Sequence, residues 1–289
     1  MQALKRILAL CAFLAAPAWA VPQATVAAVQ MPAWLERNGR TQPLAVGMEV
    51  KHGDNIRTGE GARAYLKLAE GSTVKLGENA KLAFFSHSLK PQQAFKGALD
   101  VLTGAFRFTT DALRHIQSRD VAIRVGTATA GIRGTDLWGR SNKKEDLVCL
   151  IEGNIEIKHG ALAEPVAMAE PMSFFVAPRG EAPKPVAPVD PVQFRLWARE
   201  TEIEAGDGAS RSGGKWKLLL GSHNAEASAL EQYDIARGEG YPASIMPRAG
   251  AGGAWNYEVV LAGFPDEGEA LKAAARLKAA TGIAASAVR

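Results

Sequence analysis

Cysteine and histidine are scarce in this chain of 289 residues, which contains two cysteines and five histidines. Cys11 falls within an expected leader segment, so the mature chain would keep Cys149 alone and could form no internal disulfide. The five histidines show no metal-ligand spacing with one another or with cysteine. We therefore expect neither a disulfide framework nor a metal site, and nothing in the sequence indicates a cofactor.

Sequence motifs of common enzyme classes are also missing. The chain has no Gly-x-Ser-x-Gly elbow, no phosphate-binding loop and no dinucleotide fingerprint. No acidic pair stands out from ordinary surface residues as the two carboxylates of a glycosidase would. We expect a protein that is not an enzyme and has no catalytic residues.

A strong excess of one charge is absent as well. The net charge is +4, and removal of a leader containing Lys5 and Arg6 would leave 32 basic against 30 acidic residues, a net charge of about +2. Such a balance does not argue for a nucleic-acid partner. A hydrophobic fraction of 47% is enough for two ordinary domains with cores of their own.

The first 20 residues have the pattern of a secretory signal peptide. Lys5 and Arg6 precede an apolar run from Ile7 to Ala16, and Ala18-Trp19-Ala20 is a small-x-small cleavage site. An uncleaved membrane anchor is the alternative, but the apolar run is too short to span a bilayer. We expect cleavage after Ala20, a periplasmic location and no stable membrane span afterwards.

Residues 21–178 read as a β domain. Short runs that alternate apolar and polar residues, such as Ala64 to Leu68 and Val121 to Val125, are separated by turns that contain glycine. This spacing predicts a sandwich, a barrel or a solenoid. Cys149 lies in the apolar run Leu147 to Ile151, which predicts a buried strand and an unreactive thiol.

Three motifs of this region resemble the FecR domain: the string Gly53 to Gly59, the hairpin Leu66 to Ser72, and Gly131 to Asp136 followed by Glu152-Gly153. The resemblance covers roughly residues 24–160. FecR proteins of iron-uptake signalling combine this periplasmic domain with a cytoplasmic anti-sigma segment and a membrane helix, neither of which this sequence shows. The resemblance therefore implies the fold and an envelope location, without control of a sigma factor.

The FecR-like motifs include three candidate residues for a ligand or partner site, Arg57, Arg133 and Thr135. The competing interpretation is structural: glycines for turns, hydroxyl and carboxylate side chains that bond turn amides, and an arginine that joins neighbouring loops. Trp138, just after the last motif, is expected to be a core or edge aromatic residue.

Residues 179–214 are expected to form a linker. Five prolines between Pro178 and Pro191 indicate an extended, semi-rigid segment. A short exposed helix is expected from about Pro191 to Ala205, followed by a flexible hinge from Gly206 to Gly214. The two flanking domains would then orient independently.

Residues 215–289 contain one pattern twice: an apolar run, a glycine, a capped helix and another short run. The helices are expected at about Ala225 to Arg237 and Glu267 to Ala280, and Asp266 with Glu269 forms an N-cap and N3 pair for the second. A β-α-β-β-α-β order places two helices on one face of a four-stranded sheet and leaves the other face open for binding.

The turns of this repeat, Gly221-Ser222 and Ala262-Gly263-Phe264, together with Gly240-Tyr241-Pro242 and the alanine-rich second helix, resemble the SPOR domain. That resemblance implies binding of peptidoglycan, favouring glycan strands without stem peptides. It also makes Ser222 and Trp255 candidate glycan-binding residues. The position that is polar in the family is Leu219 in this chain, and the position of the family's arginine is Glu258, so two polar partners of the sugar are missing.

Strand alternation places four side chains on the open face of the expected sheet: Lys217, Leu219, Glu258 and Val260. Leu219 and Val260 would form an exposed apolar spot beside the charged pair, a feature that more often indicates a protein contact than a sugar site.

The sequence thus predicts a multidomain protein with an all-β, sandwich or solenoid-like FecR-type domain and an α+β SPOR-type domain. The first hypothesis is an exported, non-enzymatic envelope protein that binds peptidoglycan glycan strands while its β domain binds a partner or ligand. The alternative is a signalling or scaffold protein whose SPOR-like sheet face binds a protein instead of glycan.

Overall fold

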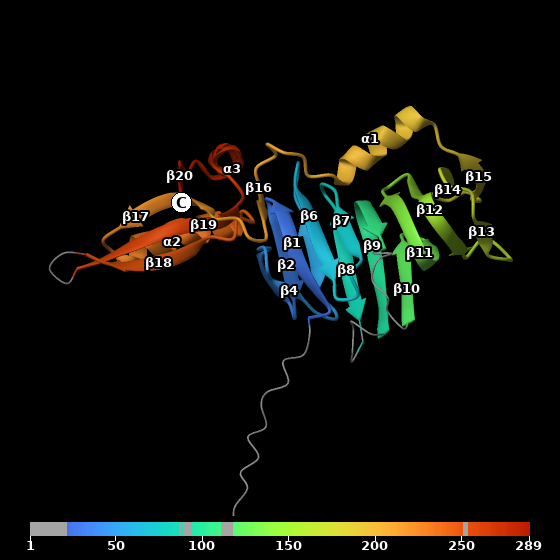
Figure 1. Ribbon diagram of the computed structural model, residues 1–289, viewed down its shortest axis with the longest axis horizontal. Helices are drawn as coiled ribbons and strands as arrows, with labels where there is room; N and C mark the ends of the chain where they lie inside the picture. The colour runs from blue at the N-terminus through green and yellow to red at the C-terminus, as the bar shows by residue number, and fades with distance from the viewer. Residues whose placement is uncertain (1–21, 87, 89–93, 111–117, 251–253) are drawn as a thin grey trace, which may run out of the picture.

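The computed structural model describes residues 22–86, 88, 94–110, 118–250 and 254–289, without the side chains of residues 118, 119 and 133. The expected leader falls outside this range, as do residues 111–117 of the stretch from Thr110 to Gln117, for which the sequence is compatible with either a helical turn or a loop excursion. The described chain forms a large β body and a smaller α+β unit, which lie end to end along the long axis of the molecule (Figure 1).

The β body is one sheet of sixteen strands that curls around a shared core and forms a barrel. A mostly-β fold for this region is therefore confirmed. The strands are β1 (Ala24–Gln30), β2 (Ala33–Arg37), β3 (Arg40–Pro43), β4 (Glu49–Val50), β5 (Asn55–Thr58), β6 (Arg63–Leu68), β7 (Thr73–Leu76), β8 (Lys81–Ser86), β9 (Ala94–Thr109), β10 (Ser118–Val125), β11 (Ala128–Ser141), β12 (Glu145–His159), β13 (Val166–Met168), β14 (Ser173–Pro178), β15 (Lys184–Pro188) and β16 (Ala209–Arg211).

Period-two alternation builds this sheet. In β6, Ala64, Leu66 and Leu68 point into the core and are at most 2% exposed, while the residues between them are half-buried. The long strand β9 pairs with β8 and β10 through its first half and with β7 and β11 through its second half. Strand β9 therefore joins the part of the sheet that contains β8 and β10 to the part that contains β7 and β11.

The C-terminal unit has the β-α-β-β-α-β order that the repeat predicts, and its sheet runs β18–β19–β17–β20 with antiparallel neighbours. Asp266 caps the second helix by accepting the backbone N–H of Glu269, as expected, whereas the first helix has no side-chain cap. The elements are β17 (Trp216–His223), α2 (Glu226–Gly238), β18 (Ser244–Ala249), β19 (Trp255–Phe264), α3 (Glu267–Thr281) and β20 (Ser286–Val288).

Residues 190–211, here called the strap, connect the two units and differ from the expected flexible linker. They contain helix α1 (Pro191–Thr201), which lies across the outside of the β body, and strand β16, which pairs with β1 (Figure 1). The helix is not free in solvent, because Trp197 is 7% exposed and stacks on Trp138 with ring centroids 5.1 Å apart. Burial of large aromatic surfaces holds the strap in place.

The strap also contacts the C-terminal unit. The Glu269 carboxylate of α3 accepts the backbone N–H groups of Gly206, Gly208 and Ala209. The C-terminal unit also contacts the β body directly, because Arg276 of α3 donates to the carbonyl oxygen of Gly61 at 2.9 Å. The two units therefore do not orient independently in this structure.

Candidate functional site

The open face of the C-terminal sheet is defined by which residues its strands bury. Leu218, Leu220, Val259 and Leu261 point toward α2 and α3 and are buried, as the alternation predicts. Strands β17 and β19 are central neighbours, and Leu219 lies opposite Val260. The face opposite the helices is left without a covering element among the described residues.

A hollow of about 200 Å³ lies on this open face. It combines an apolar floor with charged residues from β17, β18 and β19 and from the position that follows β20. Its lining consists of Lys217, Leu219, Met246, Arg248, Glu258, Val260, Val288 and Arg289. The four residues expected on this face, Lys217, Leu219, Glu258 and Val260, are thus brought together around one hollow.

Val260 differs from the exposed position that was expected. It is 3% exposed, because it lies at the floor of the hollow where longer neighbouring side chains shield it, and Leu219 is half-buried. The exposed apolar spot is therefore smaller than the sequence suggests.

Ser222 and Trp255 lie outside the lining of the hollow and on opposite faces of the sheet. Ser222 pairs with Glu258 on the open face, whereas Trp255 alternates with Asn256 and lies on the side of β19 that bears Val259 and Leu261. Trp255 is 55% exposed at the start of β19. Ser222 is exposed, and its hydroxyl accepts a hydrogen bond of 2.6 Å from the side-chain amide of Asn256. An exposed indole ring and a positioned hydroxyl are groups that can contact a sugar. Their role as glycan contacts stays a prediction.

Arg248 is a functional candidate that the sequence reasoning missed. It lies opposite Asn256 on β18, and its Nε donates to Glu258 across the strands at 3.1 Å. The short run expected after the first helix covers Tyr241 to Met246, whereas β18 continues through Pro247 to Ala249. Proline is tolerated there because β18 is an edge strand. The alternation of Met246 and Arg248 was the available signal.

Among the candidate residues of the β domain, Arg57 and Thr135 have described side chains, and these two do not line a common cavity. Arg57 lies over the Trp34 ring, 3.9 Å from the centroid, and forms an ion pair of 3.6 Å with Glu36. Thr135 is buried, and its backbone N–H donates to the Thr110 hydroxyl. The side chain of Arg133 lies outside the described part of the structure. These contacts are those of packed turns, and a ligand role for the three residues stays a prediction.

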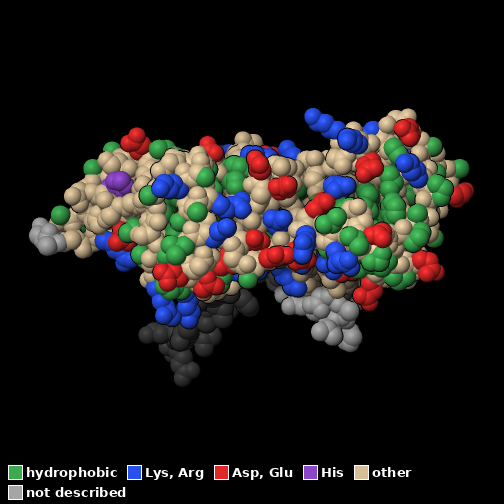
Figure 2. Space-filling model, turned by 90° about the horizontal axis from the view of Figure 1, so that it is seen from above, with side chains coloured by type: hydrophobic (Ala, Val, Ile, Leu, Met, Phe, Trp, Pro, Cys, Tyr) green, Lys and Arg blue, Asp and Glu red, His purple; other side chains and the backbone are tan. Residues whose placement is uncertain are grey.

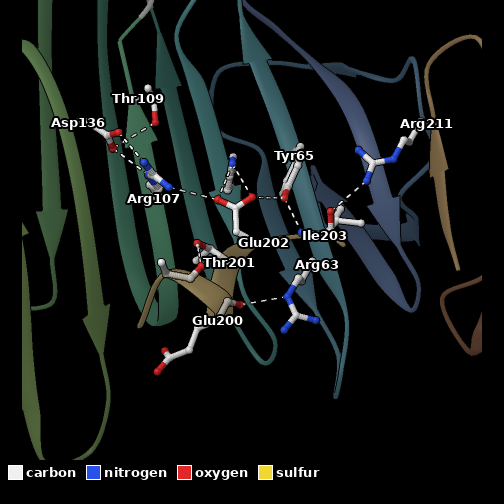
Figure 3. Close-up of polar contacts among 12 residues, drawn as sticks. Arg63, Tyr65, Arg107, Thr109, Asp136, Glu200, Thr201, Glu202, Ile203 and Arg211 are labelled. Atoms are coloured by element: carbon white, nitrogen blue, oxygen red, sulfur yellow. Dashed lines mark hydrogen bonds and ion pairs between the residues drawn. The ribbon is translucent and has the colours of Figure 1, made fainter. Parts of the chain in front are cut away.

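A polar cluster fixes the middle of the strap, directly after helix α1, to the β body (Figure 3). The Glu202 carboxylate accepts hydrogen bonds from Lys75 at 2.6 Å, from Tyr65 at 3.0 Å and from Arg107 at 3.2 Å. Burial alone would raise the pKa of Glu202, but these donors together hold the pKa below its ordinary value. Arg107 in turn bonds Asp136, so the carboxylate of the strap is tied into the sheet.

Chemistry that depends on a reactive thiol or a clustered metal site finds no support in the described residues. Burial raises the pKa of the Cys149 thiol to about 12, in keeping with its expected place in a buried strand. The described ranges hold no group of three or more His, Cys, Asp or Glu side chains arranged for a metal. Among the helices that are described, none has the length and apolarity needed to cross a membrane.

Comparison with known families agrees with this architecture. Residues 54–156 match the family model described as FecR protein, and residues 212–289 match the model of the SPOR domain. The chain therefore contains a FecR domain followed by a C-terminal SPOR domain. A SPOR domain implies peptidoglycan binding and suggests a cell-envelope location. Both families are non-catalytic, and the comparison found no enzyme domain.

Two crystal structures of a protein from Parabacteroides distasonis, described as a candidate anti-sigma factor, show a weak similarity to the chain. Their TM-scores are 0.41 and 0.42, and their identities are 11% and 12%. Each alignment covers 81% of this chain and 98% of the solved chain, with a similarity too low to define a shared fold. The comparison with curated proteins found no match.

Proposed function

We propose that this protein is an exported, non-enzymatic component of the cell envelope that binds peptidoglycan glycan strands through the open sheet face of residues 215–289. The observation that carries the proposal is the hollow on the one face of a SPOR domain that no helix covers. The FecR domain, residues 21–178, would bind a partner or ligand.

Export is the second part of the proposal. The basic start, the apolar run and Ala18-Trp19-Ala20 support a signal peptide cleaved after Ala20, and the SPOR domain supports an envelope location. The protein would then act in the periplasm, in a role connected with cell division. Processing is measured by N-terminal sequencing of the protein recovered from the envelope, where a first residue of Val21 is expected.

Retention on cell-wall sacculi tests glycan binding. The chain from Val21 to Arg289 is mixed with amidase-treated sacculi, and the bound fraction is compared with that of a Ser222→Ala variant. Loss of this exposed hydroxyl on the open face is expected to lower retention severalfold, whereas Ser228→Ala, at an exposed position on α2, is the matched control. Retention of the parent chain no higher than that of an unrelated domain contradicts the proposal.

A second candidate function has one observation in its favour. Leu219, Met246, Val260 and Val288 make half of the hollow apolar, which suits a protein contact better than a purely polar face would. If the sheet face docks on a protein, the double change Leu219→Gln with Glu258→Arg weakens assembly and leaves glycan binding unchanged or higher. Unchanged assembly in this variant argues for glycan.

A further inference from the structure

A second hollow, of about 550 Å³, lies between helix α1 and the outside of the β body. We call it the strap hollow, since one wall belongs to the strap and the other to the sheet. The strap contributes Leu196, Arg199 and Glu200, and the sheet contributes Arg63 and Arg140. Figure 2 looks onto the side of the molecule that bears α1, where basic and acidic side chains lie intermingled. Which of these charges are already paired therefore decides what the hollow can bind.

Both carboxylates that line the strap hollow are already engaged. The Oε1 of Glu200 accepts a hydrogen bond of 2.8 Å from Arg140, and the Oε2 of Glu78 accepts the backbone N–H of Gly61 at 2.7 Å. Against these two carboxylates the hollow has three guanidinium groups. The lining therefore carries an excess of one positive charge, and its acidic groups are not free to pair with the remaining arginines.

Two of the three arginines have no carboxylate partner in the part of the chain that the structure describes. Arg63 donates only to neutral oxygens, namely the carbonyl groups of Arg199 and Glu200 and the side chain of Gln30. The side chain of Arg199 is exposed and forms no hydrogen bond or ion pair with a described residue. The Nε of Arg140 is buried and has no hydrogen-bond partner there either. Since a guanidinium group has five N–H donors, all three arginines keep donors for an anionic ligand.

Apolar side chains border the same hollow. Leu196 lines it and is 54% exposed, and Val192, one helical turn earlier on α1, is exposed as well. Leu102, another exposed side chain, adjoins the lining residue Thr103. None of the described residues that line the hollow is aromatic, so it lacks a platform on which a sugar ring would stack. The ligand that fits combines acidic groups with aliphatic side chains.

The concave shape of the site suits a peptide chain better than a flat anionic surface. The side chain of Arg140 is only 27% exposed and lies on β11 beside Trp138, which α1 covers. A lipid surface would meet the outer side of α1, where Val192 and Arg195 are exposed, and would not reach the guanidinium group of Arg140. A segment of a protein can enter the hollow alongside the helix.

We propose that the strap hollow is the partner site of the FecR domain and that it binds an acidic segment of another envelope protein. Arg63, Arg140 and Arg199 pair with carboxylates of the segment, and Leu196 contacts one of its aliphatic side chains. The inference rests on the part of the proposed function that gives the FecR domain a partner, and it does not depend on glycan binding. Because the bound segment contacts the strap and the sheet at once, it also stabilises the packing of α1 on the β body.

Peptide display tests both the site and the chemistry of the partner. A library of random twelve-residue peptides is selected on the chain from Val21 to Arg289 and, in parallel, on a double variant with Arg63→Gln and Arg199→Gln. Peptides that combine acidic with aliphatic residues are expected to be enriched on the parent chain and not on the variant. Absence of any enrichment, enrichment of peptides without acidic residues, or equal enrichment on both proteins overturns the inference.

Affinities of the most enriched peptide assign the effect to residues. Arg63→Gln and Arg199→Gln are each expected to weaken binding about threefold, and this dependence should vanish when every Asp and Glu of the peptide is replaced by its amide. Leu196→Ala should weaken binding of the acidic peptide and of its amide form alike. Arg195→Gln is the matched control and should change neither, because Arg195 is exposed on the same helix and does not line the hollow.

Competing anions and melting temperatures complete the test. Tripolyphosphate and vesicles of phosphatidylglycerol should compete weakly with the peptide; a ligand of either kind that binds more tightly than the peptide and is lost in Arg199→Gln overturns the protein segment as occupant. Arg63 also bonds carbonyl groups of the strap, so its variant must melt within a few degrees of the parent chain. Arg199→Gln loses no such bond and repeats the test without that contact.

Retention on sacculi, measured on the same proteins, separates this inference from the function on which it rests. Failure of the peptide tests with retention unchanged overturns the strap hollow as the partner site and leaves glycan binding intact. Loss of retention with peptide binding intact overturns glycan binding and leaves the strap hollow as the partner site. Acidic peptides that bind the parent chain and the double variant equally place the partner surface of the FecR domain elsewhere.

Discussion

Replacing Glu269 with alanine tests whether the two domains are held in one arrangement. Glu269 is 5% exposed, and its carboxylate accepts N–H groups of the strap from Gly206 at 2.8 Å, Gly208 at 2.6 Å and Ala209 at 3.0 Å. Alanine removes all three acceptor contacts at once, while the helix cap at Asp266 uses only the backbone N–H of position 269. The change therefore affects the junction and spares the helix.

The expected magnitude follows from the groups left without a partner. A buried N–H that loses its acceptor costs about 1–3 kcal/mol, and two of the three bonds to Glu269 are fully buried. Water that enters the opened junction would recover part of this loss, so the net destabilisation of the junction is about 3 kcal/mol. That corresponds to roughly a hundredfold shift toward an open junction.

Limited proteolysis and small-angle scattering measure the open population. Cleavage within residues 204–214 is expected to accelerate in Glu269→Ala, and the radius of gyration is expected to rise as the domains separate. Glu267→Ala is the matched control, because Glu267 is exposed in the first turn of the same helix and affects only its dipole, worth a few tenths of a kcal/mol. Identical cleavage rates in the two variants would refute the role of Glu269.

Three further predictions concern the strap and the β body. Trp197→Ala removes an aromatic side chain that stacks on Trp138. This change should lower the free energy of unfolding measured in urea by about 3–5 kcal/mol. A loss below about 1 kcal/mol would contradict the stacking role. The pKa of Glu202 is lowered in the folded protein, so its stabilising contribution is present above its ordinary pKa of about 4.3 and is lost as pH falls through the folded pKa. Acid titration should therefore destabilise the parent chain more than Glu202→Gln, and parallel curves would disprove this. The thiol of Cys149 should not react with an aromatic disulfide reagent at pH 8 until the protein unfolds, because burial raises its pKa to about 12. Rapid labelling of the native protein would contradict the burial of Cys149.

The N-terminus of α3 shows how far local sequence reasoning reaches. Asp266 and Glu269 were expected to cap the helix, and Asp266 does accept the Glu269 N–H at 2.9 Å. The Glu269 carboxylate, however, bonds residues about 60 positions earlier in the chain instead of the cap. Spacing of three residues predicts a local partner. It contains no information about which distant backbone will need an acceptor.

The glycine-rich part of the strap was predicted to be a flexible hinge, but it packs against α3. A Gly-rich segment predicts flexibility when it is considered by itself. In the structure, Gly208 has φ of 76°, and a Cβ at this position would come within 2.7 Å of the backbone nitrogen of Ala273. The glycine allows α3 to approach closely and is not a hinge. Close approach and free rotation demand the same residue, so composition cannot distinguish them.

The sheet face was predicted in part because it depends on alternation. Lys217, Leu219 and Glu258 were placed on the open face from period two alone, and all three line the hollow. Arg248 was missed because the short run expected after the first helix did not extend beyond Met246. Only the position of β18 at the edge of the sheet, which is a tertiary property, shows that the strand can continue through a proline.

The junction changes what glycan binding would do to the rest of the protein. Two domains joined by a loose linker bind independently, and the second domain samples a wide volume around the first. Here the strap is paired with β1 through β16, clamped by Glu202 on one side and bonded by Glu269 on the other. A glycan held on the sheet face would therefore fix the direction in which the FecR domain points as well as its distance from the wall. Mutations at Glu269 would alter that direction without touching the glycan site, which separates wall attachment from presentation of the FecR domain.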